Sequence, residues 1–177
     1  AVDKAEQNAE IAEDVNSKGV LNLVNALMSV NGKLIHISTD YVFNGDHFMP
    51  YNESDSVSPI GVYGMTKRKG ELAVINSMLD AIVIRTSWLY SSYGNNFVKT
   101  MLRLGKQKEE LSVIFDQVGT PTYARDLAKT CLEILCGGSS VNISKNGNLY
   151  HYSNEGVASW YDFAISIMKI GGENCKV

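Results

Sequence analysis

Two short runs of branched apolar residues constrain the fold of this chain most. KLIHIS at residues 33–38 and AIVIR at residues 81–85 have the length and composition of strands buried on both faces of a sheet. Apolar residues at helical spacing precede the first run and separate it from the second. Strands that alternate with helices predict an α/β fold with a largely parallel sheet and right-handed crossovers.

The same patterns continue along the chain. Residues 43–61 hold two of the three prolines and predict a long loop of the kind that often carries function. Ser159 or the residues before it could cap the last helix. Residues 1–4 are expected to form a loop. Helices are expected over 8–30, 63–78, 95–106, 126–135 and 159–170, and further strands over 111–115 and 149–152.

Two of the predicted helices have an apolar side that should face the core. An amphipathic helix of a globular protein buries such a side. In the helix over 8–30 they are Ile11, Val15, Val20, Leu23, Val24 and Leu27. In the helix over 63–78 they are Leu72, Ala73, Ile75 and Met78.

Composition narrows the class of protein. A chain of 177 residues with 45% hydrophobic content can bury a core of its own and predicts one compact unit. A net charge of -3 without clustered Lys and Arg argues against a nucleic-acid partner. No apolar run is long enough to cross a bilayer, so no membrane partner is expected. Three cysteines without CxxC spacing favour a reducing, cytoplasmic location, with Cys131 and Cys136 as small core residues.

The candidate chemistry begins with Tyr63 and Lys67 in the stretch VYGMTKRKGE. A phenol titrates near pH 10, so a tyrosine that moves protons at neutral pH needs a cationic neighbour. Residues four apart face the same side of a helix, which would place the Lys67 ammonium beside Tyr63. The spacing alone is no better than chance, and a packing role is the more frequent one for such a tyrosine.

Polar and aromatic residues at the ends of the two predicted strands add weight to this pair. Thr39 and Asp40 follow the first strand and Trp88 follows the second, at the edge where open α/β sheets bind ligands. Thr39 could supply a hydrogen-bond donor and Trp88 an aromatic face on which a ligand could stack. Taken singly, each has a more ordinary interpretation as a turn or core residue.

Several motifs, in order along the chain, resemble those of the extended short-chain dehydrogenase/reductase superfamily. Within it they are most similar to the dTDP-4-dehydrorhamnose reductases, and the order of the motifs is more specific than YxxxK alone. They are HISTDYVFNG (36–45), Pro50-Tyr51, SPIGVYGMTKRKGE (58–71), RTSWLYSSYGNNFVKTML (85–102), DQVGTPTYARDLA (116–128) and NEGVASWYDFA (154–164).

The resemblance implies roles for the matching residues. Tyr63 would donate a proton to the C4 carbonyl oxygen of a dTDP-linked 4-keto sugar, and Lys67 would hold the nicotinamide ribose and stabilise the phenolate. Thr39 would hydrogen-bond the reacting oxygen, and Ile37 would line the cofactor. Asp40 and Trp88 would contact the nucleotide sugar. The implied cofactor is NADPH, with NADH as the alternative.

The resemblance also implies a division of the chain. Residues 1–90 would be the end of a Rossmann-like NAD(P)-binding domain, and residues 91–177 a substrate-binding region interleaved with the last strands. The glycine-rich turn that cradles the pyrophosphate in this superfamily has no match here. The chain is therefore expected to be an internal portion that is inactive alone, with a sheet edge left uncovered unless it forms a homodimer.

Other functions stay open at this point. One is a non-catalytic subunit of the same fold, like the regulatory subunit of methionine adenosyltransferase. Another is a nucleotide-sugar epimerase or dehydratase with retained NAD. The histidines and cysteines show no metal-ligand spacing, so no metal site is expected, and a need for Mg²⁺ at a subunit contact is not readable from these residues.

Overall fold

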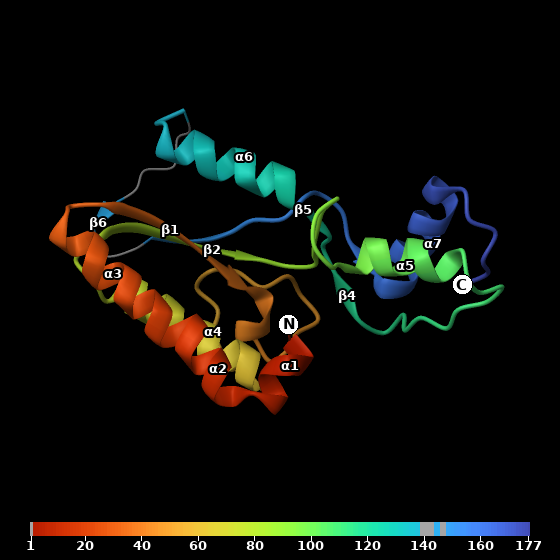
Figure 1. Cartoon of the computed structure of the whole chain (residues 1–177), viewed down its shortest axis with the longest axis horizontal. Helices are drawn as coiled ribbons and strands as arrows, with labels where there is room; N and C mark the ends of the chain where they lie inside the picture. Colours follow the sequence, from red (N-terminus) through yellow and green to blue (C-terminus); the bar gives the residue numbers. More distant parts are fainter. Residues whose placement is uncertain (1, 139–143, 146–147) are drawn as a thin grey trace. The chain divides into compact units, whose positions relative to one another are not determined.

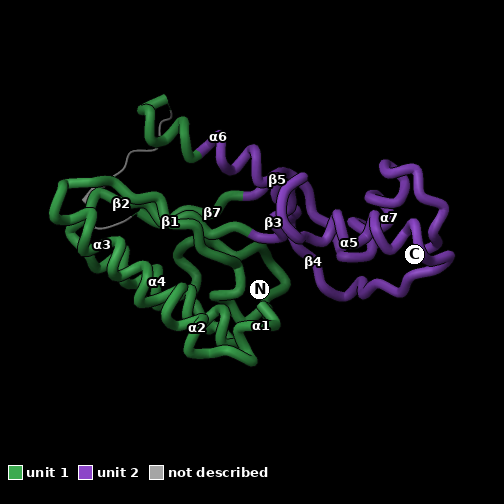
Figure 2. Tube along the Cα trace, in the orientation of Figure 1, with its two compact units in different colours: residues 1–86, 131–152 green, residues 87–130, 153–177 purple. Residues whose placement is uncertain are grey.

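The computed structural model describes residues 2–138, 144–145 and 148–177, without the side chains of 144–145. The chain divides into two compact units, which are described separately (Figure 2). Unit 1 contains residues 1–86 and 131–152, and unit 2 contains residues 87–130 and 153–177. The units are interleaved along the sequence, because the chain leaves unit 1 after Thr86 and returns to it at Cys131. The expectation was one compact unit, divided at residue 90, with the last strands interleaved with residues 91–177.

Unit 1 is built on a mainly parallel sheet, as expected for an α/β fold. Strands β1 (Lys33–Thr39) and β2 (Asp80–Thr86) pair in parallel, with Thr39 opposite Thr86. Strand β7 (Asn148–His151) pairs in parallel with β2 along its other side, and β6 (Ser144–Lys145) pairs antiparallel with the start of β2. Among the described strands β1 pairs on one side only, so the expected uncovered sheet edge is present.

The helices of unit 1 precede and connect these strands. They are α1 (Val2–Gln7), α2 (Ala9–Glu13), the π-helical turn η1 (Asp14–Lys18), α3 (Gly19–Ser29) and α4 (Val62–Ile75). Helices α3 and α4 lie side by side against β1 and β2 (Figure 1). The helix α1 replaces the loop expected for residues 2–4, and Ala1 lies outside the described residues.

The apolar stripe predicted for residues 8–30 is only partly buried. Val20 and Val24 belong to the core, whereas Ile11, Val15 and Leu23 are exposed. The π turn η1 adds a residue to one turn of the helix, so apolar residues before and after it do not share one α-helical face.

The core of unit 1 lies between this helical layer and the sheet. On α4 the buried residues include Val74 and Glu71, whereas Leu72, which was expected to face the core, is exposed. Met78, also expected to face the core, lies beyond the end of α4 and is exposed. Leu72 is exposed because α4 turns its polar residues to the core instead. Thr66 and Glu71 have hydrogen-bond partners inside the unit. The buried core residues are Val20, Val24, Val74, Leu79, Ala81 and Val83.

Unit 2 contains short strand pairs and two packed helices. Strands β3 (Leu89–Tyr90) and β5 (Thr122–Tyr123) pair in parallel, and β4 (Val118–Gly119) and β8 (Ala158–Ser159) pair antiparallel. Helices α5 (Phe97–Gly105) and α7 (Trp160–Gly171) pack around Met101, Ala164, Ile167, Met168 and Cys175. Residues 111–115 form no strand, and α6 (Ala124–Leu135) spans the boundary between the two ranges.

Two further expectations can be compared with the described residues. Cys136 is exposed and Cys131 half-buried, so the prediction that both are core residues is wrong for Cys136. No helix in the described parts of the chain is long and apolar enough to cross a membrane.

Candidate active site

The carboxyl end of β1 carries the first of the candidate residues. Thr39 is buried and ends β1, and it caps the short helix η2 (Asp40–Val42) by accepting a hydrogen bond from the Tyr41 amide at 3.2 Å. Its hydroxyl donates to the Asp40 carboxylate at 3.0 Å. Burial raises the pKa of Asp40, and the hydrogen bond from Thr39 opposes that shift. The two residues therefore form one polar group at the strand end.

Tyr63 lies in the first turn of α4, next to this polar group. Its ring meets that of Tyr41 edge-on, with the centroids 5.6 Å apart. Burial raises the pKa of the Tyr63 phenol, hydrogen bonding by Thr39 opposes the rise, and the charge of Asp40 adds to it. The phenol is therefore protonated at neutral pH and is close enough to Thr39 for the two hydroxyl groups to act on one ligand atom.

Lys67 lies one turn further along α4 and reaches β1. Its ammonium group donates to the carbonyl oxygen of Ile37 at 2.6 Å. Burial lowers the pKa of Lys67, and the charge of Glu71 opposes this. A lysine ammonium has three N–H donors, so two remain for other acceptors. Four of the predicted residues, namely Ile37, Thr39, Tyr63 and Lys67, thus lie at one strand end, together with Asp40.

A glycine lets α4 approach this strand end closely. A Cβ atom on Gly64 would lie 2.1 Å from the carbonyl oxygen of Tyr41, so only glycine fits there without a backbone shift. Gly70 has the same role against η1, where a Cβ would lie 2.3 Å from the Asn16 carbonyl oxygen. Asn16 also donates to Thr66 at 3.1 Å. These close contacts fix the position of Tyr63 and Lys67 relative to their neighbours.

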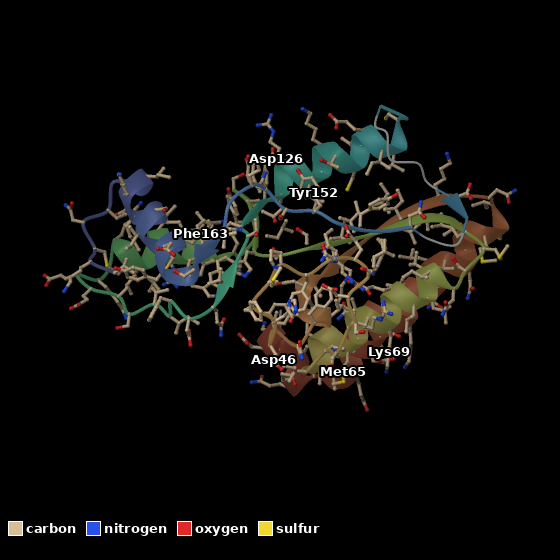
Figure 3. The ribbon with its side chains drawn as sticks, turned by 180° about the vertical axis from the view of Figure 1, so that it is seen from behind. Asp46, Met65, Lys69, Asp126, Tyr152 and Phe163 are labelled. Carbon is tan, nitrogen blue, oxygen red and sulfur yellow. The ribbon has the colours of Figure 1, made fainter. Side chains whose placement is uncertain are left out.

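The opposite side of α4 has ordinary surface character. Met65 and Lys69, labelled in Figure 3, lie four residues apart on one side of the helix and are exposed. Lys69 pairs with Glu13 of α2 at 2.8 Å. Tyr63 and Lys67 each lie two residues from this pair and therefore face the other way.

A buried ion pair behind the site was not identified from the sequence. Glu71 is fully buried, and Arg85, 3% exposed, donates to both its carboxylate oxygens at 2.8 Å. Arg68 donates to the same carboxylate at 2.7 Å. Burial favours the protonated acid, but the hydrogen bonds outweigh it, and the pKa of Glu71 is lowered. The one available signal was an arginine inside the apolar run AIVIR.

Aromatic residues of the long loop cover this ion pair. Phe43 stacks on Tyr51 with the centroids 4.2 Å apart, and the Arg85 guanidinium lies 5.1 Å from the Phe43 ring. The ring of His151, at the end of β7, meets that of Phe43 edge-on at 5.8 Å, and the His151 amide donates to the Glu53 carboxylate at 2.8 Å. The loop over 43–61 is thereby fixed to the sheet.

Trp88 belongs to unit 2. Its backbone is left-handed, with φ of 48°, which is rare for a bulky residue. Its indole stacks on that of Trp160, with the centroids 3.5 Å apart and the planes 8° from parallel. Phe163, labelled in Figure 3, lies in the same group of rings, 6.4 Å from Trp88. The stacking of Trp88 on Trp160 was not predicted.

The chain's residues can be tested against a metal and a nicotinamide cofactor. Among the described residues no group of three His, Cys, Asp or Glu is placed to hold a metal ion. His36 faces α4 inside the unit, and burial lowers its pKa to about 4. The two remaining N–H groups of Lys67, which lies one helical turn after Tyr63 on α4, fit the paired hydroxyls of a ribose.

Comparison with known proteins gives a consistent result. The model of the family described as "RmlD substrate binding domain" matches residues 1–175. A curated relative from Escherichia coli K12, dTDP-4-dehydrorhamnose reductase, is 42% identical over 173 residues, which cover 96% of this chain and 56% of that protein.

Two solved structures are also similar. The dTDP-4-dehydrorhamnose reductase of Clostridium acetobutylicum superposes with a TM-score of 0.92 at 43% identity. The match covers all of this chain and 60% of the Clostridium chain. The dTDP-4-dehydrorhamnose reductase of Bacillus anthracis, solved in complex with NADP, superposes with a TM-score of 0.91 at 42% identity. The match covers 99% of this chain and 61% of the Bacillus chain. The chain thus spans little more than half the length of the proteins it matches.

Proposed function

Because the chain belongs to the RmlD substrate-binding domain family, we propose that it carries the catalytic residues of an NADPH-dependent reductase. The reaction is reduction of the C4 keto group of dTDP-4-dehydro-β-L-rhamnose to dTDP-L-rhamnose, a precursor of cell-surface polysaccharides. The observation that carries this proposal is the packing of α4 against the end of β1, which brings Tyr63, Lys67 and Thr39 together. The names of the relatives support the substrate, and the NADP bound to the Bacillus anthracis relative supports the cofactor.

The proposed chemistry assigns one task to each residue. When bound, NADPH supplies the hydride for the C4 carbon. The Tyr63 hydroxyl donates its proton to the C4 oxygen as negative charge develops there, and the Thr39 hydroxyl turns its one O–H from Asp40 to donate a hydrogen bond to the same oxygen. Lys67 holds the ribose hydroxyls with the two N–H groups that Ile37 leaves unused, and its charge favours the phenolate that remains.

Asp40 and Trp88 are proposed to contact the nucleotide sugar. Asp40 lies beside Thr39, joined to it by the hydrogen bond of 3.0 Å, so a contact with a sugar hydroxyl would place the sugar next to the reacting oxygen. Trp88 is assigned to the sugar nucleotide by the family resemblance.

The product of the complete open reading frame that encodes this chain provides the test. With NADPH and the 4-keto sugar, we expect Tyr63→Phe to lower kcat by roughly 10²–10⁴-fold while binding of the nucleotide sugar persists. Tyr41→Phe is the matched control, because it removes a hydroxyl from the ring that packs on Tyr63. Near-normal turnover by Tyr63→Phe would overturn the proposed proton donor.

The same assay distinguishes the other functions. A wild-type protein that oxidised no NADPH would contradict the reductase, and NAD that co-purified with it would favour an epimerase or dehydratase. Oxidation of NADPH that depends on the 4-keto sugar supports the reductase.

A further inference from the structure

Both faces of the Trp88 indole are covered within unit 2. Trp160 covers one face at 3.5 Å. A Cβ atom on Gly119 would lie 2.5 Å from Cε2, 2.7 Å from Nε1 and 2.8 Å from Cζ2 of Trp88. A point 2.5 Å from Cε2 and farther from both Nε1 and Cζ2 lies above the ring and not in its plane. Since Trp160 already fills one face, the glycine covers the other.

The two covering residues are held in place by the same strand pair. Gly119 lies opposite Ala158 in the β4–β8 ladder, and Trp160 follows that ladder directly as the first residue of α7. The Ser159 side chain caps α7 in a reciprocal capping box with Asp162. The Phe97 ring packs on Trp160 with the centroids 4.6 Å apart. The covering residues thus belong to a hydrogen-bonded frame.

The backbone of Trp88 needs such a frame. A left-handed conformation is unfavourable for a bulky side chain and persists where the surroundings enforce it. With Trp160 stacked on one face and Gly119 over the Cε2–Nε1 part of the other, the indole offers less room for a base or sugar to stack than an open ring would. The edge is where the indole carries its single hydrogen-bond donor, Nε1–H.

We propose that Trp160 and Gly119 clamp Trp88 so that its edge, and not its face, contacts the oxygen atoms of the nucleotide sugar. Trp160 is then a positioning residue that acts through Trp88. This inference rests on the proposed function, which assigns Trp88 to the substrate. The inference predicts that the affinity for the sugar nucleotide depends on Trp160, although Trp160 acts only through Trp88.

The experiment compares variants of the product of the complete open reading frame. Two measurements are made: circular dichroism in the indole bands as a difference from wild type, and KM and kcat with the nucleotide sugar and with NADPH. Two stacked indoles produce a coupled pair of bands of opposite sign, which is lost when either ring is removed. Trp160→Leu and Gly119→Ala disturb the clamp, Trp160→Phe keeps an aromatic ring, and Tyr161→Phe on the same helix is the control.

The clamp predicts a specific pattern. Trp160→Leu removes the paired bands and raises KM for the nucleotide sugar up to about tenfold, with kcat and KM for NADPH within about twofold. Gly119→Ala raises the same KM with both indoles present, and Trp160→Phe recovers most of the wild-type value. In a Trp88→Phe background Trp160→Leu adds no further change, because its effect passes through Trp88.

Three results would overturn the clamp. They are an unchanged KM in Trp160→Leu and Gly119→Ala, an additional full effect of Trp160→Leu in the Trp88→Phe background, and paired bands that survive in Trp160→Leu. If the wild-type protein did not turn over the nucleotide sugar, the proposed function would fail. The clamp would then be decided by the circular dichroism alone, in which survival of the paired bands contradicts it and their loss supports it.

Discussion

Replacement of Glu71 by Gln should destabilise unit 1 far more than loss of an exposed ion pair does. Glu71→Gln keeps the shape of the side chain but removes the charge that faces Arg85, which is 3% exposed. The guanidinium would then stay buried beside a neutral amide that can accept fewer of its hydrogen bonds. Removing one partner of a buried pair costs about 3–5 kcal/mol, a large part of the roughly 5–15 kcal/mol that stabilises a domain.

The assay has to report on unit 1 alone. Both tryptophans of the chain lie in unit 2, so indole fluorescence does not follow the unfolding of the sheet. Hydrogen exchange at the amides of β2 does, because these amides pair with β1 and β7. We expect their opening free energy to fall by about 3–5 kcal/mol in Glu71→Gln.

Glu13→Gln is the matched control, since Glu13 also pairs with a cation of α4 but its partner Lys69 is 57% exposed. Exposed pairs contribute about 0–1 kcal/mol. Equal effects of the two substitutions on the β2 amides would refute the reasoning.

The pH dependence provides an independent check on Glu71. Its pKa is lowered in the folded chain, chiefly by Arg85 once burial is outweighed, so the folded state favours the charged form. The resulting stabilisation is present above the unfolded pKa of about 4.3 and is lost as pH falls through the lower folded value. The difference in stability between wild type and Glu71→Gln should therefore shrink below about pH 4. A difference that stayed constant into acid would contradict this assignment.

Two further substitutions test the positioning of the helices. Gly64→Ala places a Cβ 2.1 Å from the Tyr41 carbonyl oxygen, so we expect a loss of about 1–3 kcal/mol in urea unfolding and reduced turnover. Gly61→Ala meets only the flexible Glu6 side chain and should have little effect; an equal loss there would refute the close approach. Ser159→Ala removes the cap of α7 and should cost unit 2 about 1 kcal/mol by indole fluorescence, whereas Ser166→Ala, on the exposed side of α7, should not.

The parts of the fold that could be predicted are those with a strong local signal. The runs at 33–38 and 81–85 became β1 and β2 because short β-branched runs have few alternatives to a strand. The burial expected of both runs is found along β2, whereas β1 is buried only at Ser38 and Thr39.

The run at 111–115 has the same appearance but forms no strand. Leu111 and Val113 pack against the core of unit 2, and the backbone makes isolated hydrogen bonds, from the Leu111 amide to Lys176 and from the Tyr161 amide to Ile114. A strand requires a second segment that pairs with it along its length, and a short sequence window does not contain that segment.

The site shows the same limit. Tyr63, Lys67 and Thr39 could be proposed from their residue types and order, because a helix between parallel strands returns the chain to one edge. The Glu71–Arg85 pair, the close approach at Gly64 and the clamp on Trp88 could not. Each depends on residues from two elements whose packing angle and register no short sequence window contains.

The direction of the pKa shift at Tyr63 bears on which reaction this site favours. A reduction needs a tyrosine that still holds its proton when the hydride arrives, whereas an oxidation begins with a phenolate that accepts one. Burial and the Asp40 charge both raise the pKa of Tyr63, and the Lys67 ammonium is bonded to the Ile37 carbonyl at 2.6 Å. The described residues therefore favour the protonated form of Tyr63, from which the proposed reductase would transfer a proton to the alkoxide formed on its substrate. This is the state that a proton donor in ketone reduction requires, and it is the less suitable one for an epimerase that starts by removing a proton.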